Sequence, residues 1–252
     1  MNFYRYASPA TFYPLAGKLV SGFAAIAAVL FAIGLYLAFF VAPTDFQQSE
    51  VYRVIFIHVP AAWMGMFIYL VMAFYAALAL GFNTRLAAMM MQALAPTGML
   101  FTALALWTGS LWGKPTWGTW WVWDARMTST LILLFLYFGY IALHNAIEDQ
   151  RRADRAGALL VLVGAVNIPV IYFSVKWWNT LHQGATIGVG SAPAMARIML
   201  VTMLVMTFAC WAYAIAVALA RVRSIILERE AGTQWASELL AAENAQARGV
   251  AR

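Results

Sequence analysis

Long apolar runs alternate with short polar stretches along this 252-residue chain, and the alternation predicts six membrane-spanning helices. A helix needs about 20 apolar residues to cross a bilayer. Runs near that length lie at about 19–42, 54–80, 87–108, 127–144, 156–174 and 195–220. Most charged residues fall in the stretches between these runs. We therefore expect an all-α integral membrane protein that forms one membrane domain over residues 1–252.

Glycine and proline residues interrupt the helical pattern after residue 108. The breakers are Gly109, Gly113, Pro115 and Gly118. Such closely spaced breakers are typical of turns and loops, so we expect a Trp-rich loop over 109–126. The last 32 residues, 221–252, are polar and rich in alanine, and we expect a tail that begins as an extension of the sixth helix.

Composition agrees with a membrane protein and excludes several soluble classes. Only 10% of the residues are charged, whereas soluble domains average about 25%. The net charge of +6 does not indicate nucleic-acid binding, because the basic residues flank apolar runs and build no continuous basic face. With one cysteine, Cys210, the chain forms no intrachain disulfide. It has no CxxCH haem-attachment motif and no P-loop, so any use of ATP requires a partner.

The distribution of basic residues predicts how the chain is oriented. Eleven lysines and arginines fall on the side that holds both termini, and five fall on the other side. Cytoplasmic loops carry the excess of Lys and Arg, so we expect both termini in the cytoplasm of a bacterial cell, with the chain in the inner membrane. The loop 109–126, the start of the second helix and the loop 175–193 then face outward, toward the periplasm of a Gram-negative cell.

Tryptophan is concentrated in one short stretch. Six of the 11 tryptophans are Trp107, Trp112, Trp117, Trp120, Trp121 and Trp123. Indoles favour the membrane–water interface, so an aromatic belt that anchors a loop explains one or two of them. A flat cluster of indoles bordered by Asp124 and Arg126 also suits a flat aromatic ligand with charged substituents, such as a porphyrin.

Two of the three histidines, His58 and His182, are expected on the outer side with the Trp-rich stretch, whereas His144 is expected on the cytoplasmic side. Neutral imidazole is a standard axial ligand of haem iron, and two histidines from separate segments can bind one iron from opposite faces. The alternative is an interfacial polar residue in each case. We interpret His144 as structural.

Charged residues near this stretch suit the haem propionates. Arg126 is the first candidate, because arginine forms bidentate pairs with carboxylates. Weaker candidates are Arg53, Lys114 and Lys176, for which a charge that snorkels to the interface is an equal alternative. Asp124 can pair with Arg126, cap the fourth helix or touch a partner protein.

The stretch WGTWWVWDAR resembles the WWD signature of the haem-handling proteins of cytochrome c maturation, and nearly the whole chain is similar to the six-helix CcmC type. The IHVPAAWMG and LHQG stretches match the two histidine stretches of that family. The resemblance implies that His58 and His182 are the axial ligands of haem b. By the same resemblance, the haem site includes Trp117, Trp120, Trp121, Trp123, Asp124 and Arg126.

The resemblance also implies a function. A CcmC-like protein binds haem at the periplasmic face and delivers it to the haem chaperone CcmE, beside CcmA, CcmB and CcmD of an ABC-type complex. It is a binding and transfer module rather than a conventional enzyme. One alternative is a haem lyase that attaches haem to apocytochrome, although larger relatives of that kind carry more histidines. A small-solute transporter is the other, and it predicts mid-span charges or an inverted repeat, which the sequence lacks.

Overall fold

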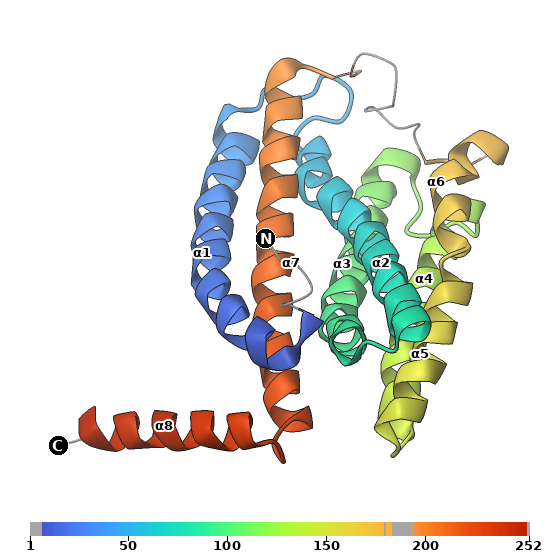
Figure 1. Ribbon diagram of the computed structural model, residues 1–252. Coiled ribbons are helices and arrows are strands. Elements are labelled where there is room, and N and C mark those ends of the chain that lie inside the picture. The colour runs from blue at the N-terminus through green and yellow to red at the C-terminus, as the bar shows by residue number, and fades with distance from the viewer. Residues whose placement is uncertain (1–6, 179, 183–192, 194, 251–252) are drawn as a thin grey trace.

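The computed structural model describes residues 7–178, 180–182, 193 and 195–250, with side chains described up to residue 242. All regular elements in this part of the chain are helices (Figure 1). Six helical segments of the described residues are long and apolar enough to cross a membrane. The expected all-α membrane protein with six spans is therefore confirmed.

The helical elements of the described residues are given in chain order. They are α1 (Pro9–Tyr36), the π-helical turn η2 (Leu37–Val41), the 3-10 turn η3 (Val51–Val54), α2 (Ile55–Phe82), α3 (Arg85–Trp117), α4 (Ala125–Ala146), α5 (Gln150–Gly164), α6 (Asn167–Trp177), α7 (Arg197–Arg229) and α8 (Gln234–Val250). The first span begins ten residues earlier than expected, at Pro9, and the last continues to Arg229. Residues 221–229 thus extend α7, and α8 follows as a separate helix.

The expected loop over 109–126 is wrong in its first half. Helix α3 continues without interruption to Trp117, and only 118–124 lie outside helices. Helix α3 ends next to Gly118, which adopts the left-handed conformation with φ of +79°. Glycine tolerates this conformation without strain. A glycine inside a helix costs about 1 kcal/mol relative to alanine. Tertiary packing offsets that cost here, because Gly109 and Gly113 lie against neighbouring groups.

The expected fifth helix, 156–174, is two helices that together form one span. Helix α5 ends at Gly164 and α6 begins at Asn167. Proline lacks a backbone N–H, so Pro169 cannot donate to the carbonyl of Ala165. Instead, the N–H of Ile168 donates a hydrogen bond to the carbonyl of Ala165 at 3.1 Å. The side chain of Asn167 donates to the carbonyl of Ser129 in α4 at 2.8 Å and fixes the break against its neighbour.

Helix α3 is the centre of the bundle and the most buried of the spans. It packs against α2, α4 and α7, while α1 lies along α7 at the outer edge (Figure 1). The core holds the fully buried ring of Tyr137 in α4. Its hydroxyl donates to the carbonyl of Gly65 in α2 at 2.7 Å, and Gly98 in α3 leaves the space that this ring fills.

Gly98→Ala is expected to lower the free energy of unfolding by about 1–3 kcal/mol, because the added methyl group overlaps the ring of Tyr137. Gly22→Ala is the matched control, since Gly22 is also helical and an added Cβ meets nothing within 4 Å there. We expect this control to be neutral or slightly stabilising. Thermal unfolding in detergent measures the difference, and equal midpoints for the two variants would contradict the packing.

Candidate functional site

His58 lies in the first turns of α2 and is buried, with 9% of its surface exposed. Its Nδ1 is 3.1 Å from the hydroxyl oxygen of Thr108 in α3. That hydroxyl already donates its proton to the carbonyl of Leu104 at 2.6 Å. Thr108 therefore accepts from Nδ1–H, which places the proton of the neutral ring on Nδ1 and leaves the lone pair on Nε2. Metal-bound imidazoles are oriented in this way by a partner of the other nitrogen.

Two further residues of α3 shape the surroundings of His58. A Cβ on Gly109 would lie 2.8 Å from Cε1 of the His58 ring, so only glycine leaves room for the imidazole here. The Trp112 ring meets His58 edge to face, with centroids 5.8 Å apart. The indole N–H of Trp112 donates to Gln48 at 2.7 Å, which holds the ring in place. The α2–α3 contact thus fixes the position of His58.

The structure brings His182 next to His58. Their ring centroids are 6.2 Å apart, and the ring planes are inclined by 35°. A metal ion bonded to both rings at about 2.0–2.1 Å per bond would hold the two centroids about 6 Å apart. The observed spacing therefore matches that of two imidazoles on opposite sides of one metal ion.

Asp124 connects the beginning of α4 to the segment that carries His182. One carboxylate oxygen caps α4 by accepting from the N–H of Met127 at 2.7 Å. The other accepts from the hydroxyl of Thr180, and the Thr180 oxygen accepts from the backbone N–H of His182 at 3.1 Å. Of the roles considered for Asp124, helix capping is confirmed. Among the described residues it forms no ion pair with Arg126, because the Arg126 guanidinium points to the carbonyl of Ile171, 3.4 Å away.

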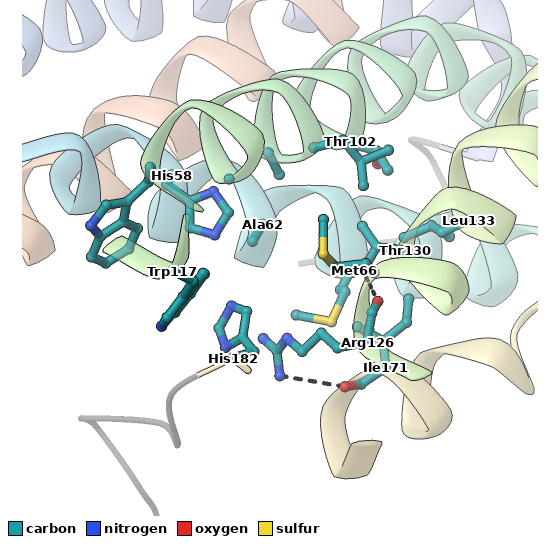
Figure 2. A pocket seen from close by; sticks show the side chains of 15 residues that line it. His58, Ala62, Met66, Thr102, Trp117, Arg126, Thr130, Leu133, Ile171 and His182 are labelled. Carbon is teal, nitrogen blue, oxygen red and sulfur yellow. Dashed lines mark hydrogen bonds between the residues drawn. The ribbon is translucent and has the colours of Figure 1, made fainter. Parts of the chain in front are cut away.

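His58, His182 and Arg126 line one cavity of about 70 Å³ (Figure 2). Most of its remaining wall is apolar, and Trp117 forms one side. One water molecule needs about 10–15 Å³ of such space, so this cavity has room for a few water molecules and is small. A flat ligand centred between the two histidines has the axial spacing it needs. The outer parts of such a ligand need more space than the cavity has. They would extend beyond the cavity edge or displace flexible side chains such as Met66 and Met127.

The four expected tryptophans do not lie equally close to this cavity. Trp117 lines it, and also lines a smaller cavity beside it together with Trp120 and Trp121. Trp123 is 75% exposed, and its ring centroid is 5.4 Å from that of Trp121. Trp117 is thus an inner wall, whereas Trp123 faces outward.

Sequence reasoning missed Thr108 and Gly109 as site residues, and it named only as a member of the tryptophan cluster the third residue beside His58, Trp112. The expected loop placed the last two outside helical structure. On a continuous helix, Thr108 and Trp112 are one turn apart and share a face. Continuing the helical period of α3 by two turns would have placed these residues on the face toward His58.

The weaker cationic candidates have partners elsewhere and line no part of this cavity. Arg53 donates to the carbonyls of Ala38 and Ala42 and pairs with Glu50. The side chains of Arg53 and Thr44 both donate hydrogen bonds to the Glu50 carboxylate, and these bonds hold the pKa of Glu50 below its usual value. Lys114 donates to the carbonyl of Gly118 at 3.1 Å, and Lys176 lies over the ring of Phe173.

His144 lies at the opposite end of the bundle, outside this cavity. Its Nε2 is 3.1 Å from the Asp154 carboxylate, which also pairs with Arg229. This polar network joins α4, α5 and α7, which agrees with a structural role.

Known proteins resemble this chain over nearly its whole length. Residues 2–237 match the family model described as "Heme exporter protein C". A protein of that name from Escherichia coli K12 is 45% identical over 235 residues, which cover 93% of this chain and 94% of that protein. Its namesake from Bradyrhizobium diazoefficiens is 45% identical over 223 residues, 88% of this chain and 84% of that protein. The one from Haemophilus influenzae is 43% identical over 234 residues, with 93% and 95% covered.

Asp124→Ala is expected to speed amide hydrogen exchange at His182 as well as at Met127, because the carboxylate that holds Thr180 is lost. Asp149→Ala is the control: Asp149 also caps a helix, α5, by accepting from the N–H of Arg152 at 2.8 Å. Both variants should lose about 1 kcal/mol of stability. Exchange followed by mass spectrometry should show faster exchange at His182 in Asp124→Ala alone. If both variants behave alike there, Asp124 does not position that segment.

Proposed function

This chain belongs to the "Heme exporter protein C" family, and from that premise we propose that it binds haem b between His58 and His182 and delivers it to the haem chaperone CcmE. The family handles haem during cytochrome c maturation, and the six spans make this a multi-pass membrane protein. In this proposal haem is the cargo, and the chain is a binding and transfer module rather than a catalyst.

The observation that carries the proposal is the 6.2 Å separation of the two imidazoles across one cavity. Haem supplies an iron with two axial positions, which histidine nitrogens fill well. Thr108 accepts from Nδ1–H of His58 and so leaves Nε2 of that ring available to the iron. His182 is carried by a segment outside the helices, and Asp124 and Thr180 hold it toward His58. One proposed ligand is thus held in a helix, and the other lies on a segment outside the helices.

The rest of the cavity suits the remaining parts of haem. Arg126 is a cation in a mostly apolar wall and has no carboxylate within 4 Å among the described residues, so a propionate would be a favourable partner. Trp117 provides an indole face for the porphyrin ring. Trp120 and Trp123 are 52% and 75% exposed and lie at the outer edge, where an acceptor protein can reach them.

The excess of basic residues supports an orientation with both termini in the cytoplasm and this site at the periplasmic face of a bacterial inner membrane. The chain carries no P-loop, so ATP hydrolysis in this process is assigned to partner subunits, CcmA with CcmB, and CcmD completes the proposed complex.

The absorption spectrum of the full-length protein, purified after co-expression with CcmE, tests the ligands. Wild type is expected to show the sharp bands of low-spin haem, and both His58→Ala and His182→Ala should lose or shift them. His144→Gln is the control, because it changes the third histidine at the other end of the bundle. Unchanged spectra in both ligand variants would place the iron ligands elsewhere. Well-folded protein without haem would leave the Trp-rich segment as an interfacial anchor.

The molecule that accepts haem from this chain distinguishes transfer to a chaperone from the action of a haem lyase. Haem-loaded protein is mixed with purified CcmE or with an apocytochrome peptide that carries CxxCH. Loss of haem from this chain to CcmE alone is the expected result. Transfer to the peptide alone would favour the lyase.

Thr108→Val is expected to weaken haem binding by about 10–100-fold, because valine keeps the shape of threonine but cannot accept from Nδ1–H of His58. Thr207→Val is the matched control: Thr207 is also buried, and its hydroxyl donates to the carbonyl of Met203 at 2.8 Å in α7. Titration with haem gives the two dissociation constants. Equal constants would mean that Thr108 does not orient the ligand.

A further inference from the structure

A polar pocket of about 220 Å³ lies at the end of the bundle opposite His58. It is formed where α2 ends, α3 begins and α5 begins, at the lower end in Figure 1. The 25 residues of α2 from His58 to Phe82 span about 36 Å, because each step along the helix rises about 1.5 Å. The hydrocarbon core of a bilayer is about 30 Å thick. With His58 near one membrane face, this pocket therefore lies at the headgroup level of the other face.

Three arginines from two helices line this pocket, which we call the Arg151–Arg155 pocket. They are Arg85 at the start of α3 and Arg151 and Arg155 at the start of α5. Arg85 pairs with the buried carboxylate of Glu230 at 2.7 Å, so that charge is balanced. Arg151 and Arg155 have no acidic partner within 4 Å among the described residues.

The one carboxylate in the wall does not neutralise these two arginines. Asp154 accepts from Arg229 at 2.9 and 3.0 Å through its two oxygens, and Nε2 of His144 lies 3.1 Å from it. Because Arg229 balances Asp154, two positive charges remain in the pocket, from Arg151 and Arg155. The first turn of α3 adds to this field, since the Thr84 hydroxyl donates to the carbonyl of Leu78 and does not cap the helix.

The pocket is also amphipathic. Ala79 and Leu80 of α2 form an apolar part of its wall, next to the arginines. Leu80 is a partly exposed side chain of a membrane-spanning helix. A ligand with an anionic head and an apolar chain fits this arrangement, because its head meets Arg151 and Arg155 while its chain follows α2 into the bilayer. Basic pockets between membrane helices bind lipid headgroups in this way.

We propose that the Arg151–Arg155 pocket binds a phosphate group, supplied by an anionic phospholipid of the bilayer. The site is independent of haem, because its residues lie at the other end of α2 and none of them lines the cavity of His58 and His182. Bound lipid fastens the turn between α2 and α3 to the start of α5 and so fixes the far ends of the two helices that hold His58.

Native mass spectrometry of the full-length chain in detergent tests this site. Wild type, Arg151→Gln, Arg155→Gln and the control Arg152→Gln are each titrated with phosphatidylglycerol and with phosphatidylcholine of the same acyl chains. Arg152 is exposed, lies between the two pocket arginines in sequence and does not line the pocket, so its variant removes one equal charge outside the site.

Arg151→Gln and Arg155→Gln are each expected to weaken phosphatidylglycerol binding about fivefold, and Arg152→Gln is expected to match wild type. Wild type should also prefer phosphatidylglycerol to phosphatidylcholine. The proposal is overturned if Arg152→Gln weakens binding as much as the pocket variants, or if none of the three does. The haem spectrum is recorded on the same samples, and it should be unchanged in all three variants.

Inorganic phosphate, added to the same titration, distinguishes the source of the phosphate group. Retention of phosphatidylglycerol in the presence of excess inorganic phosphate supports a lipid. If inorganic phosphate displaces the lipid from wild type, and its own binding is lost in Arg151→Gln and Arg155→Gln, the pocket is a phosphate site that a soluble ligand fills. That result keeps the chemistry and overturns the lipid source.

Discussion

The close contact between α2 and α3 is the constraint on which the rest of the structure depends. Gly65 of α2 lies against Thr102 of α3, and Gly109 of α3 lies against His58 of α2, so each helix gives up a side chain where the other needs space. Small residues let membrane helices approach closely. Within a bilayer, close packing stabilises helix association in place of the hydrophobic effect, because lipid tails are themselves apolar. The same contact places the Thr108 hydroxyl beside Nδ1 of His58. A buried imidazole thereby gains a hydrogen-bond partner and a defined orientation.

The second histidine is held by different means. His182 belongs to a segment that follows α6, and it reaches His58 through a chain of polar groups that begins at Asp124. Asp124 also caps α4, so one carboxylate fixes a helix end and the segment of His182 together. This explains why an aspartate ends the Trp-rich stretch. His58 thus belongs to a helix, whereas His182 is positioned by side chains of a segment outside the helices.

The two ends of the bundle carry different chemistry. At one end, aromatic rings and two histidines surround a small apolar cavity that contains one arginine. At the other end, Arg229 pairs with Asp154 beside His144, and Asp154 lines a polar pocket together with three arginines. Helices α2 and α3 run between the two ends and contribute to both (Figure 1). Because ionised groups are costly within the hydrocarbon layer, the positions of these clusters also mark its two boundaries.

The sequence by itself determined the number of spans and the all-α class, and it predicted the short set of residues that we propose for haem binding. Hydrophobic runs of bilayer length admit few other folds, since every backbone polar group in lipid must be bonded within a helix or a closed barrel. The rule that glycine interrupts helices failed at Gly109 and Gly113, where packing continued α3, whereas the expected single fifth helix is divided near Pro169, which lacks an N–H. Tertiary structure alone decided which tryptophans face the cavity and which partners hold His58 and His182. Those facts depend on contacts between residues 50 or more positions apart, such as His58 with Thr108 and Asp124 with Thr180, and no local pattern encodes them.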